Sequence, residues 1–243
     1  MDADKLLRLK LAGGVALFCA VIVFAADVIM LGVPVSGEVN SNYQGLATID
    51  DWKLRVGGYG AFAILGFVIG VWQLYEGIKP AGSWWSIPAF LLLSNFFLSG
   101  AIFHFALPFI GAAIKAEAQI SQPQFRKMCE MMWSYALIPG VVSVASLVLG
   151  SIWFAAAVLF RPTYFPRWMA VLAPGLPIGT ACLITRLLPA PWGGYLLPPC
   201  VHLATPFIFG VSTALLWNID VVNRPIDSEG YRKIGLRSPR PKT

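Results

Sequence analysis

Three ionisable residues lie inside otherwise apolar stretches of this sequence and are its candidates for chemistry. They are Asp27, His104 and His202, and the two histidines are the only ones in the chain. Ionisable groups are costly to place in lipid, so those found there usually mark a site or a protein-facing polar contact. A carboxylate that orients an imidazole forms a proton-transferring pair. We therefore predict that Asp27, His104 and His202 are catalytic residues that act by acid–base chemistry.

The two histidines occur in related words of sequence. HFALPFIG at 104–111 and HLATPFIFG at 202–210 share the pattern H-x-A-x-P-F-I. A proline four residues after each histidine removes the amide that would have bonded to the carbonyl of that histidine. Each segment is thus expected to offer an imidazole and a free carbonyl at one level. The match also suggests an inverted three-plus-three repeat, although strict inversion would place the histidines at opposite depths.

The stretches that position these residues have the composition of membrane spans. Hydrophobic residues make up 57% of the chain and charged residues 12%, whereas a soluble domain carries about 25% charged residues. Residues 84–113 contain no formal charge, and about 20 apolar residues already cross the hydrocarbon core. The basic residues collect at the ends of apolar runs, which indicates topology and argues against nucleic acid as a partner. We predict an all-α integral membrane protein.

The apolar runs predict a bundle of six transmembrane helices in one domain, residues 1–219, followed by a basic and partly disordered tail, residues 220–243. The expected spans are 11–32, 57–78, 84–113, 132–160, 168–188 and 195–219. Between them, 33–56 is expected to be a solvated connector or a lid, and 114–131 an amphipathic connector. Six spans place both termini on one side, which holds twelve of the 18 lysines and arginines. The excess of basic residues predicts that this side is the cytoplasm.

This topology brings the three ionisable side chains to one depth. Counting from the centre of each span at 1.5 Å per residue places Asp27, His104 and His202 about 8–9 Å toward the external face. Other polar residues near the outer ends of their spans are expected to bind the ligand at the mouth of the site: Arg186, Tyr59, Tyr135 and Tyr195.

A site of this kind, in a chain with 13% aromatic residues, suits a lipophilic small molecule of isoprenoid or lipid type. The expected reactions are isomerisation, cyclisation or hydrolysis without a metal or cofactor, and no G-x-S-x-G nucleophile motif is present. One alternative makes His104 and His202 the axial ligands of a haem b in an electron-transfer subunit. Others are a small transporter, or a non-catalytic subunit that forms a homo-oligomer or larger complex through the G-x-x-x-G faces at 66–70 and 175–179.

The cysteines and the missing motifs restrict the remaining chemistry. The four cysteines form no C-x-x-C pair, so they are expected to be small buried hydrophobic residues. No P-loop is present, which argues against ATP-driven transport within this chain.

Several short sequence motifs resemble those of a known group of proteins, and the resemblance extends over most of the chain. They are GVPVSG at 32–37, PAGSWWSIP at 80–88, GAIFH at 100–104, YFPRWMA at 164–170 and LPAPWGGYL at 188–196. In these the chain resembles a group of uncharacterised bacterial membrane proteins with six spans. The resemblance implies a bacterial inner-membrane protein and brings no activity with it.

Overall fold

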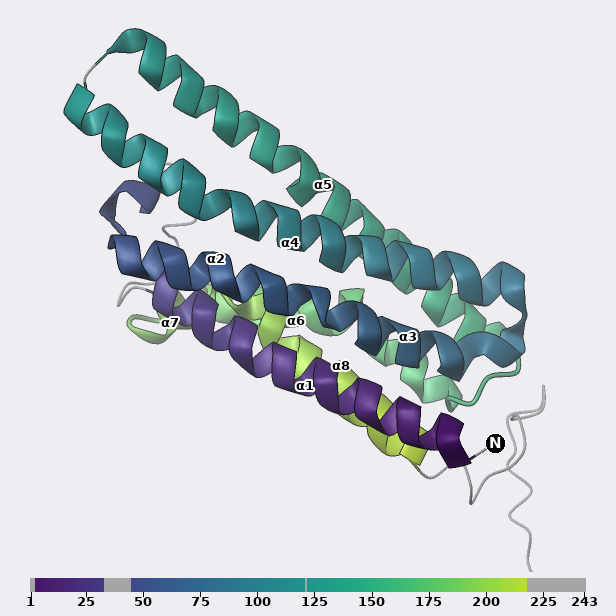
Figure 1. Cartoon of the computed structure of the whole chain (residues 1–243). Helices are drawn as coiled ribbons and strands as arrows, with labels where there is room; N and C mark the ends of the chain where they lie inside the picture. The colour runs from purple at the N-terminus through teal and green to yellow at the C-terminus, as the bar shows by residue number, and fades with distance from the viewer. Residues whose placement is uncertain (1–2, 33–44, 121, 218–243) are drawn as a thin grey trace, which may run out of the picture.

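The computed structural model describes residues 3–32, 45–120 and 122–217, and all regular structure in these ranges is helical (Figure 1). The long helices are α1 (Ala3–Leu31), α2 (Asp51–Leu65), α3 (Phe67–Ile78), α4 (Ser83–Ile120), α5 (Pro123–Phe160) and α8 (Cys200–Trp217). The shorter elements are η1 (Gly45–Thr48), η2 (Lys79–Ala81), η3 (Arg167–Leu172), α6 (Gly175–Leu187) and α7 (Trp192–Leu196). The predicted tail, residues 220–243, lies outside the described residues.

Within the described residues, five helical segments are long and apolar enough to cross a membrane. They are α1, the 31-residue segment formed by α2, α3 and η2, and the helices α4, α5 and α8. The predicted span 168–188 differs, because it begins as the 3-10 helix η3 and continues as α6, a helix of 13 residues. That helix is only about 20 Å long, and Pro174 at its start cannot continue an α-helical hydrogen-bond ladder from η3.

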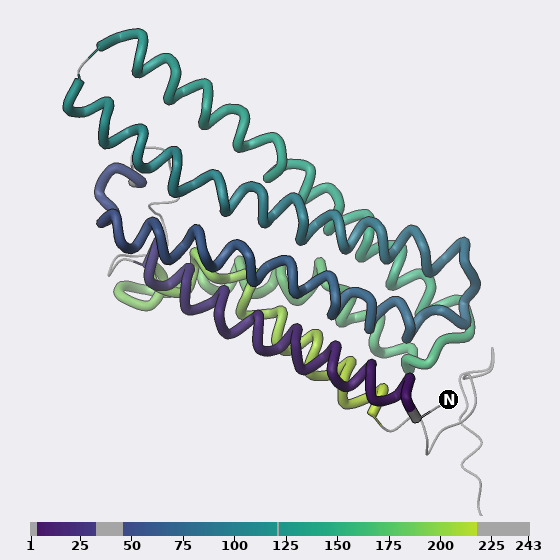
Figure 2. The backbone as a smooth tube through the Cα atoms, in the orientation of Figure 1, coloured from purple at the N-terminus to yellow at the C-terminus, as the bar shows by residue number. Residues whose placement is uncertain are grey.

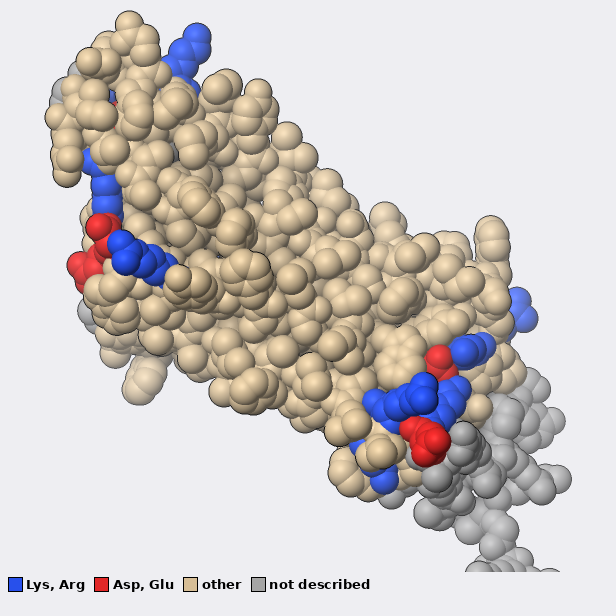
Figure 3. All heavy atoms as spheres, viewed as in Figure 1, with Lys and Arg blue, Asp and Glu red and all other residues tan. Residues whose placement is uncertain are grey.

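Neighbouring helices run in opposite directions along an elongated bundle (Figure 2). The start of α1 and the end of α8 lie at the same end, where the Nζ of Lys10 is 4.4 Å from the ring centre of Trp217. Charged residues gather at the two ends of the bundle, and few are seen on the face between them (Figure 3). Large apolar side chains such as Phe18 and Phe109 are exposed, which fits a lipid-facing surface.

Helices α4 and α5 are longer than the sequence suggested. Each has 38 residues, about 57 Å at 1.5 Å per residue, whereas the hydrocarbon core is about 30 Å thick. The predicted connector 114–131 is thus mostly the continuation of both helices, and together they extend beyond the rest of the bundle (Figure 1). Ion pairs support this extension, with Arg126 lying 3.2 Å from Glu130 on the next turn of α5.

Close helix packing occurs at the first G-x-x-x-G pattern. A Cβ added at Gly70 would lie 2.7 Å from the Cβ of Ala16 on α1 and 2.6 Å from the ring of Phe209 on α8, and one at Gly66 would clash with the sulfur of Cys19. This glycine face is therefore buried inside the chain. At the second pattern, Gly175 donates a hydrogen bond to Ser151 Oγ on α5 at 2.7 Å.

Near the start of α1, a buried side-chain amide joins three helices. Gln73 on α3 is fully buried, and its Nε2 donates to the carbonyl of Leu9 at 3.2 Å and to Thr213 Oγ1 at 2.9 Å. Ser212 Oγ donates to Gln73 Oε1 at 3.2 Å. These hydrogen bonds fix the register of α1, α3 and α8, the first and last of which carry predicted site residues.

Candidate functional site

The carboxylate of Asp27 contacts both histidines of the chain. Its Oδ1 lies 3.5 Å from His104 Nδ1, and its Oδ2 lies 3.3 Å from His202 Nε2. The two imidazole rings are 5.8 Å apart between centroids. The three side chains come from α1, α4 and α8, so the convergence that the depth count predicted is present in the structure. We call this group the Asp–His–His cluster.

The backbone and an aromatic neighbour position the histidines. Pro108 and Pro206 both remain inside their helices, so the histidine carbonyl one turn earlier lacks its usual amide partner in each case. Phe67 on α3 stacks on the ring of His202, with 5.7 Å between centroids and 20° between planes. This contact holds the His202 ring within the core.

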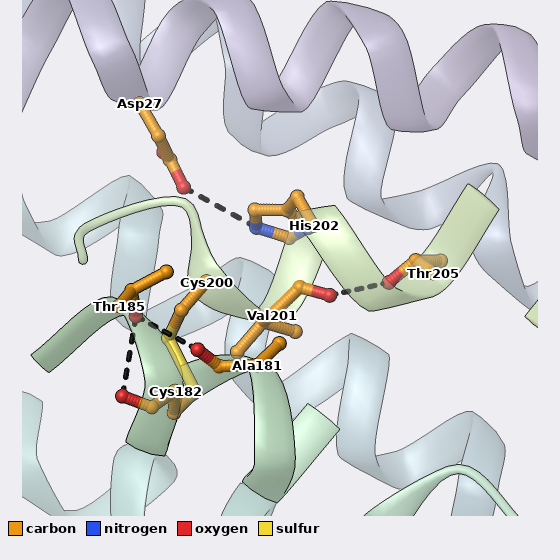
Figure 4. The surroundings of a disulfide bond; sticks show 8 residues. All are labelled: Asp27, Ala181, Cys182, Thr185, Cys200, Val201, His202 and Thr205. Atoms are coloured by element: carbon orange, nitrogen blue, oxygen red, sulfur yellow. Dashed lines mark hydrogen bonds and ion pairs between the residues drawn. A yellow bond between two sulfur atoms is a disulfide. The ribbon is translucent and has the colours of Figure 1, made fainter. Parts of the chain in front are cut away.

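A disulfide between Cys182 and Cys200 fixes the start of α8 to α6, and their Cα atoms are 4.9 Å apart. Cys200 precedes His202 by two residues, so the cross-link lies directly beside the Asp–His–His cluster (Figure 4). The expectation that all four cysteines are small buried hydrophobic residues is therefore wrong for these two, which are cross-linked. Cys129 is buried as expected, and Cys19 is half-buried.

Two polar atoms of the cluster are buried without a hydrogen bond. They are Asp27 Oδ2 and His202 Nδ1. The 3.3 Å separation between Asp27 Oδ2 and His202 Nε2 is thus a close polar contact whose geometry is not that of a hydrogen bond. Since the great majority of buried polar side-chain atoms have a hydrogen-bond partner, these two atoms call for an explanation.

An apolar cavity of about 650 Å³ lies beside the cluster, mainly between α4 and α5. Its wall is formed by aromatic, aliphatic and glycine residues, among them Phe96, Phe97, Gly100, Phe103, Leu137, Gly140, Val141 and Val144. His104 and His202 also line it, and the side chain of His104 is 19% exposed, against 4% for His202. Asp27 is not among the residues that line the cavity.

The cavity opens on the side of the bundle. Val141 and Val144 of α5 line it and are 68% and 61% exposed on the apolar outer surface. Buried apolar residues pack on the side of the cluster away from the start of α1: Met30 and Leu107, each one turn beyond a member of the cluster, pack with Leu46 and Ile49. The described part of the predicted connector or lid thus contributes to an apolar layer over the cluster; residues 33–44 lie outside the described residues.

The four predicted ligand-binding residues lie elsewhere. Arg186 and Tyr135 are exposed, and Tyr195 is half-buried beside Gly32. Tyr59 lines a second cavity of about 710 Å³ between α2 and α4, together with Arg55 and Lys115. None of the four lines the cavity that reaches the histidines.

Sequence reasoning missed the apolar wall of the first cavity, although helical spacing contains a signal for part of it. Gly100 precedes His104 by four residues on α4, so it lies on the same helix face one turn away. Gly140 on α5 has no comparable signal, because its position opposite Phe103 depends on how α4 and α5 pack.

The cluster also determines which groups the site would hold. A haem iron bound by both histidines would have to lie between the two imidazoles, where the Asp27 carboxylate contacts each of them. A single metal ion is smaller and suits the geometry better, since one ligand atom from each of Asp27, His104 and His202 lies within 4.8 Å of the others.

Comparison with known proteins gives a family without an assigned activity. The model of a family of unknown function, DUF6796, matches residues 1–217. This agrees with the resemblance to an uncharacterised group. No curated protein and no solved structure matches the chain.

Proposed function

The chain belongs to this family of unknown function, and we propose that it is a bacterial inner-membrane protein that binds a lipophilic, isoprenoid- or lipid-like small molecule and acts on it by acid–base chemistry. The observation that carries the proposal is the apolar cavity whose polar lining includes the two histidines bridged by Asp27.

The cavity has the size and character of a small-molecule site. Its volume of about 650 Å³ falls in the range of about 300–1,000 Å³ typical of ligand pockets, which combine an apolar wall with a few convergent polar groups. The lateral opening and the apolar layer over the cluster favour a ligand that enters from the bilayer. These features point to a compound with a long apolar part and one reactive group near the histidines.

The exposures within the cluster assign the roles. His104 presents more of its surface than His202 and is the proton-transferring group. Its Nδ1 faces Asp27, which leaves Nε2 for the ligand. Asp27 orients the ring and stabilises the imidazolium form, as a carboxylate does in other Asp–His pairs. The reactions that need only this chemistry are isomerisation, cyclisation and hydrolysis.

The orientation that we propose has six crossing segments, with α6 and η3 as the fifth, and both termini in the cytoplasm. The common end of α1 and α8 supports a shared side for the termini. The Cys182–Cys200 disulfide lies toward the opposite end, beside His202. Since disulfides persist in oxidising compartments, its position favours the periplasm for that end.

A substitution that fills the cavity tests ligand binding. At Gly140 an added Cβ would make only ordinary contact, 3.4 Å from Phe103, so Gly140→Leu is expected to fold and to project its branches into the cavity. Gly179→Leu is the matched control, because nothing lies within 4 Å of a Cβ added there. Mass spectrometry of organic extracts from the purified proteins should show a lipophilic compound with wild type and with Gly179→Leu, and its loss with Gly140→Leu.

Turnover assays on lipid extracts test the chemistry. His104→Ala is expected to retain the bound compound and to lose conversion of it by at least tenfold, and His202→Ala should lose less. Unchanged turnover in both variants would contradict the acid–base proposal, and equal ligand content in Gly140→Leu and wild type would contradict the assigned cavity.

A further inference from the structure

We infer that Asp27, His104 and His202 form a binding site for one divalent transition-metal ion of the zinc class, with an open coordination position toward the apolar cavity. The inference deepens the proposed function and rests on it for the identity of the reacting ligand. With the ion bound, both imidazoles would be metal ligands, and the proton-transferring role of His104 would pass to a water that the ion makes more acidic.

The separations within the cluster fit a metal ion. Zinc binds imidazole nitrogen and carboxylate oxygen at about 2.0–2.2 Å in a tetrahedral arrangement, so two of its ligand atoms lie about 3.3–3.5 Å apart. Asp27 Oδ1 and Oδ2 lie at 3.5 and 3.3 Å from His104 Nδ1 and His202 Nε2. One ligand atom from each of the three residues can be chosen so that all lie within 4.8 Å of one another. Small side-chain movements would bring the set to coordination distance.

The carboxylate oxygen Asp27 Oδ2, which has no hydrogen-bond partner, also supports a bound cation. Asp27 is 2% exposed, and its Oδ2 accepts no hydrogen bond although His202 Nε2 is 3.3 Å away. A donor and an acceptor that paired by sharing a proton would place the N–H along the line between the two atoms. The contact does not have this geometry, so Asp27 Oδ2 keeps its lone pairs available to a cation.

The types of ligand and their number define the class of ion. Two imidazoles and a carboxylate suit zinc, iron and related divalent ions, whereas magnesium and calcium prefer sites built from oxygen. Three protein ligands leave a fourth position free, which is the arrangement of catalytic rather than structural zinc sites. The side chain of His104 reaches the cavity, so the free position can face a ligand bound there.

The disulfide has a positioning role in this site. Cys182 and Cys200 are bonded to each other, so their sulfurs are not ligands. The bond instead fixes the start of α8, which carries His202, against α6 (Figure 4). Ligands that are held in place before the ion arrives lose less conformational entropy on binding.

The test measures metal content and uptake of the full chain, purified through an affinity tag without histidine. Elemental analysis is expected to find about one transition-metal ion per chain, or about one Zn²⁺ taken up after treatment with a chelator and reconstitution. Asp27→Asn keeps the shape of the side chain and should lower the content at least tenfold. Glu76→Gln is the matched control, because it changes a buried acid near Lys5 and Lys79 and should leave the content unchanged.

A spectroscopic readout separates metal loss from misfolding. Co²⁺ in place of Zn²⁺ should give visible absorption bands in the wild type and in Gly140→Leu, and none in Asp27→Asn that retains wild-type circular dichroism. No metal in the wild type and no Zn²⁺-dependent rise in its unfolding temperature would overturn the inference, as would equal uptake by Asp27→Asn.

The two proposals fail in different ways. If the wild type carries a lipophilic compound that Gly140→Leu lacks, but no protein binds metal, the proposed ligand site stands and the metal site is overturned. If the wild type binds metal stoichiometrically but carries no lipophilic compound, the metal site stands and the ligand site is overturned. If turnover survives complete removal of the metal, proton transfer is assigned to His104 itself, and the role of a metal-bound water in proton transfer is overturned.

Discussion

Asp27 is the residue through which the two histidines of the chain interact. Its two oxygens lie at similar distances from the two rings, 3.5 and 3.3 Å. In a buried site the attraction between opposite charges is weakly screened, so a proton or cation placed on one ring is felt by the carboxylate and through it by the other ring. A change at Asp27 should therefore affect both imidazoles.

Nuclear magnetic resonance of the histidine rings tests this coupling. Only two histidines are present, so a sample labelled at histidine with ¹⁵N gives two imidazole systems that single substitutions can assign. Asp27→Asn is expected to shift the ring signals of both residues, because it removes the charge that both contact. Glu76→Gln should move neither; a variant at Asp27 that shifts only one ring would contradict the bridging geometry.

At the scale of the helices, small residues set how closely α1 approaches α3 and α8. Gly70 on α3 faces Ala16 on α1 and Phe209 on α8, and Ala16 and Ala20 are fully buried. These contacts lie along the same helix that carries Asp27. The close approach therefore keeps the carboxylate within reach of His202.

Paired glycine substitutions test the role of this packing. Gly70→Val would overpack the contact with Ala16 and Phe209 and is expected to destabilise the fold by about 1–3 kcal/mol. Gly14→Val should have little effect, because nothing lies within 4 Å of a Cβ added at Gly14. Thermal unfolding in detergent measures both. Equal unfolding temperatures for the two variants would show that the glycine face is not a packing constraint.

The elements also show what the sequence could and could not predict. Apolar runs predict the five helical segments that are long and apolar enough to cross a membrane, and residue depth follows from counting along them, so the meeting of Asp27, His104 and His202 was within reach. The extension of α4 to Ile120 was missed because a stretch with charged residues resembles a connector in the sequence. The sequence does not show that such residues are paired, as Lys115 is with Asp51 at 2.6 Å. The Cys182–Cys200 bond was missed because spacing in sequence does not determine which cysteines meet.

At the scale of the whole molecule, the lysines and arginines of the described residues are equally divided between the two ends. Six lysines and arginines lie toward the end with the start of α1: Lys5, Arg8, Lys10, Lys79, Arg161 and Arg167. Six lie toward the other end: Lys53, Arg55, Lys115, Arg126, Lys127 and Arg186. The two-to-one bias that predicts cytoplasmic termini therefore depends on the six basic residues from 224 to 242.

Removal of the tail tests this dependence. Cysteines introduced as Gln122→Cys and Ser83→Cys lie at opposite ends of the α4 and α5 region, and a membrane-impermeant maleimide applied to intact cells reports their sides. In the full chain only Gln122→Cys should be labelled. After deletion of residues 218–243 both should be labelled in part, because six basic residues then face six. The unsubstituted chain gives the background, and unchanged labelling after deletion would show that the orientation is set elsewhere.

Under the proposed function, the exposed wall of the cavity between α4 and α5 affects how the affinity for a lipophilic ligand has to be expressed. A compound that reaches the histidines through lipid is first enriched in the bilayer by its apolar carbon, at about 0.8 kcal/mol per buried CH₂. Partitioning into the bilayer thus raises the concentration of the compound at the cavity. Even a low intrinsic affinity of the cavity for the compound then gives high occupancy. Occupancy should then follow the mole fraction of the compound in the membrane and fall on dilution with lipid or detergent at constant aqueous concentration of the protein.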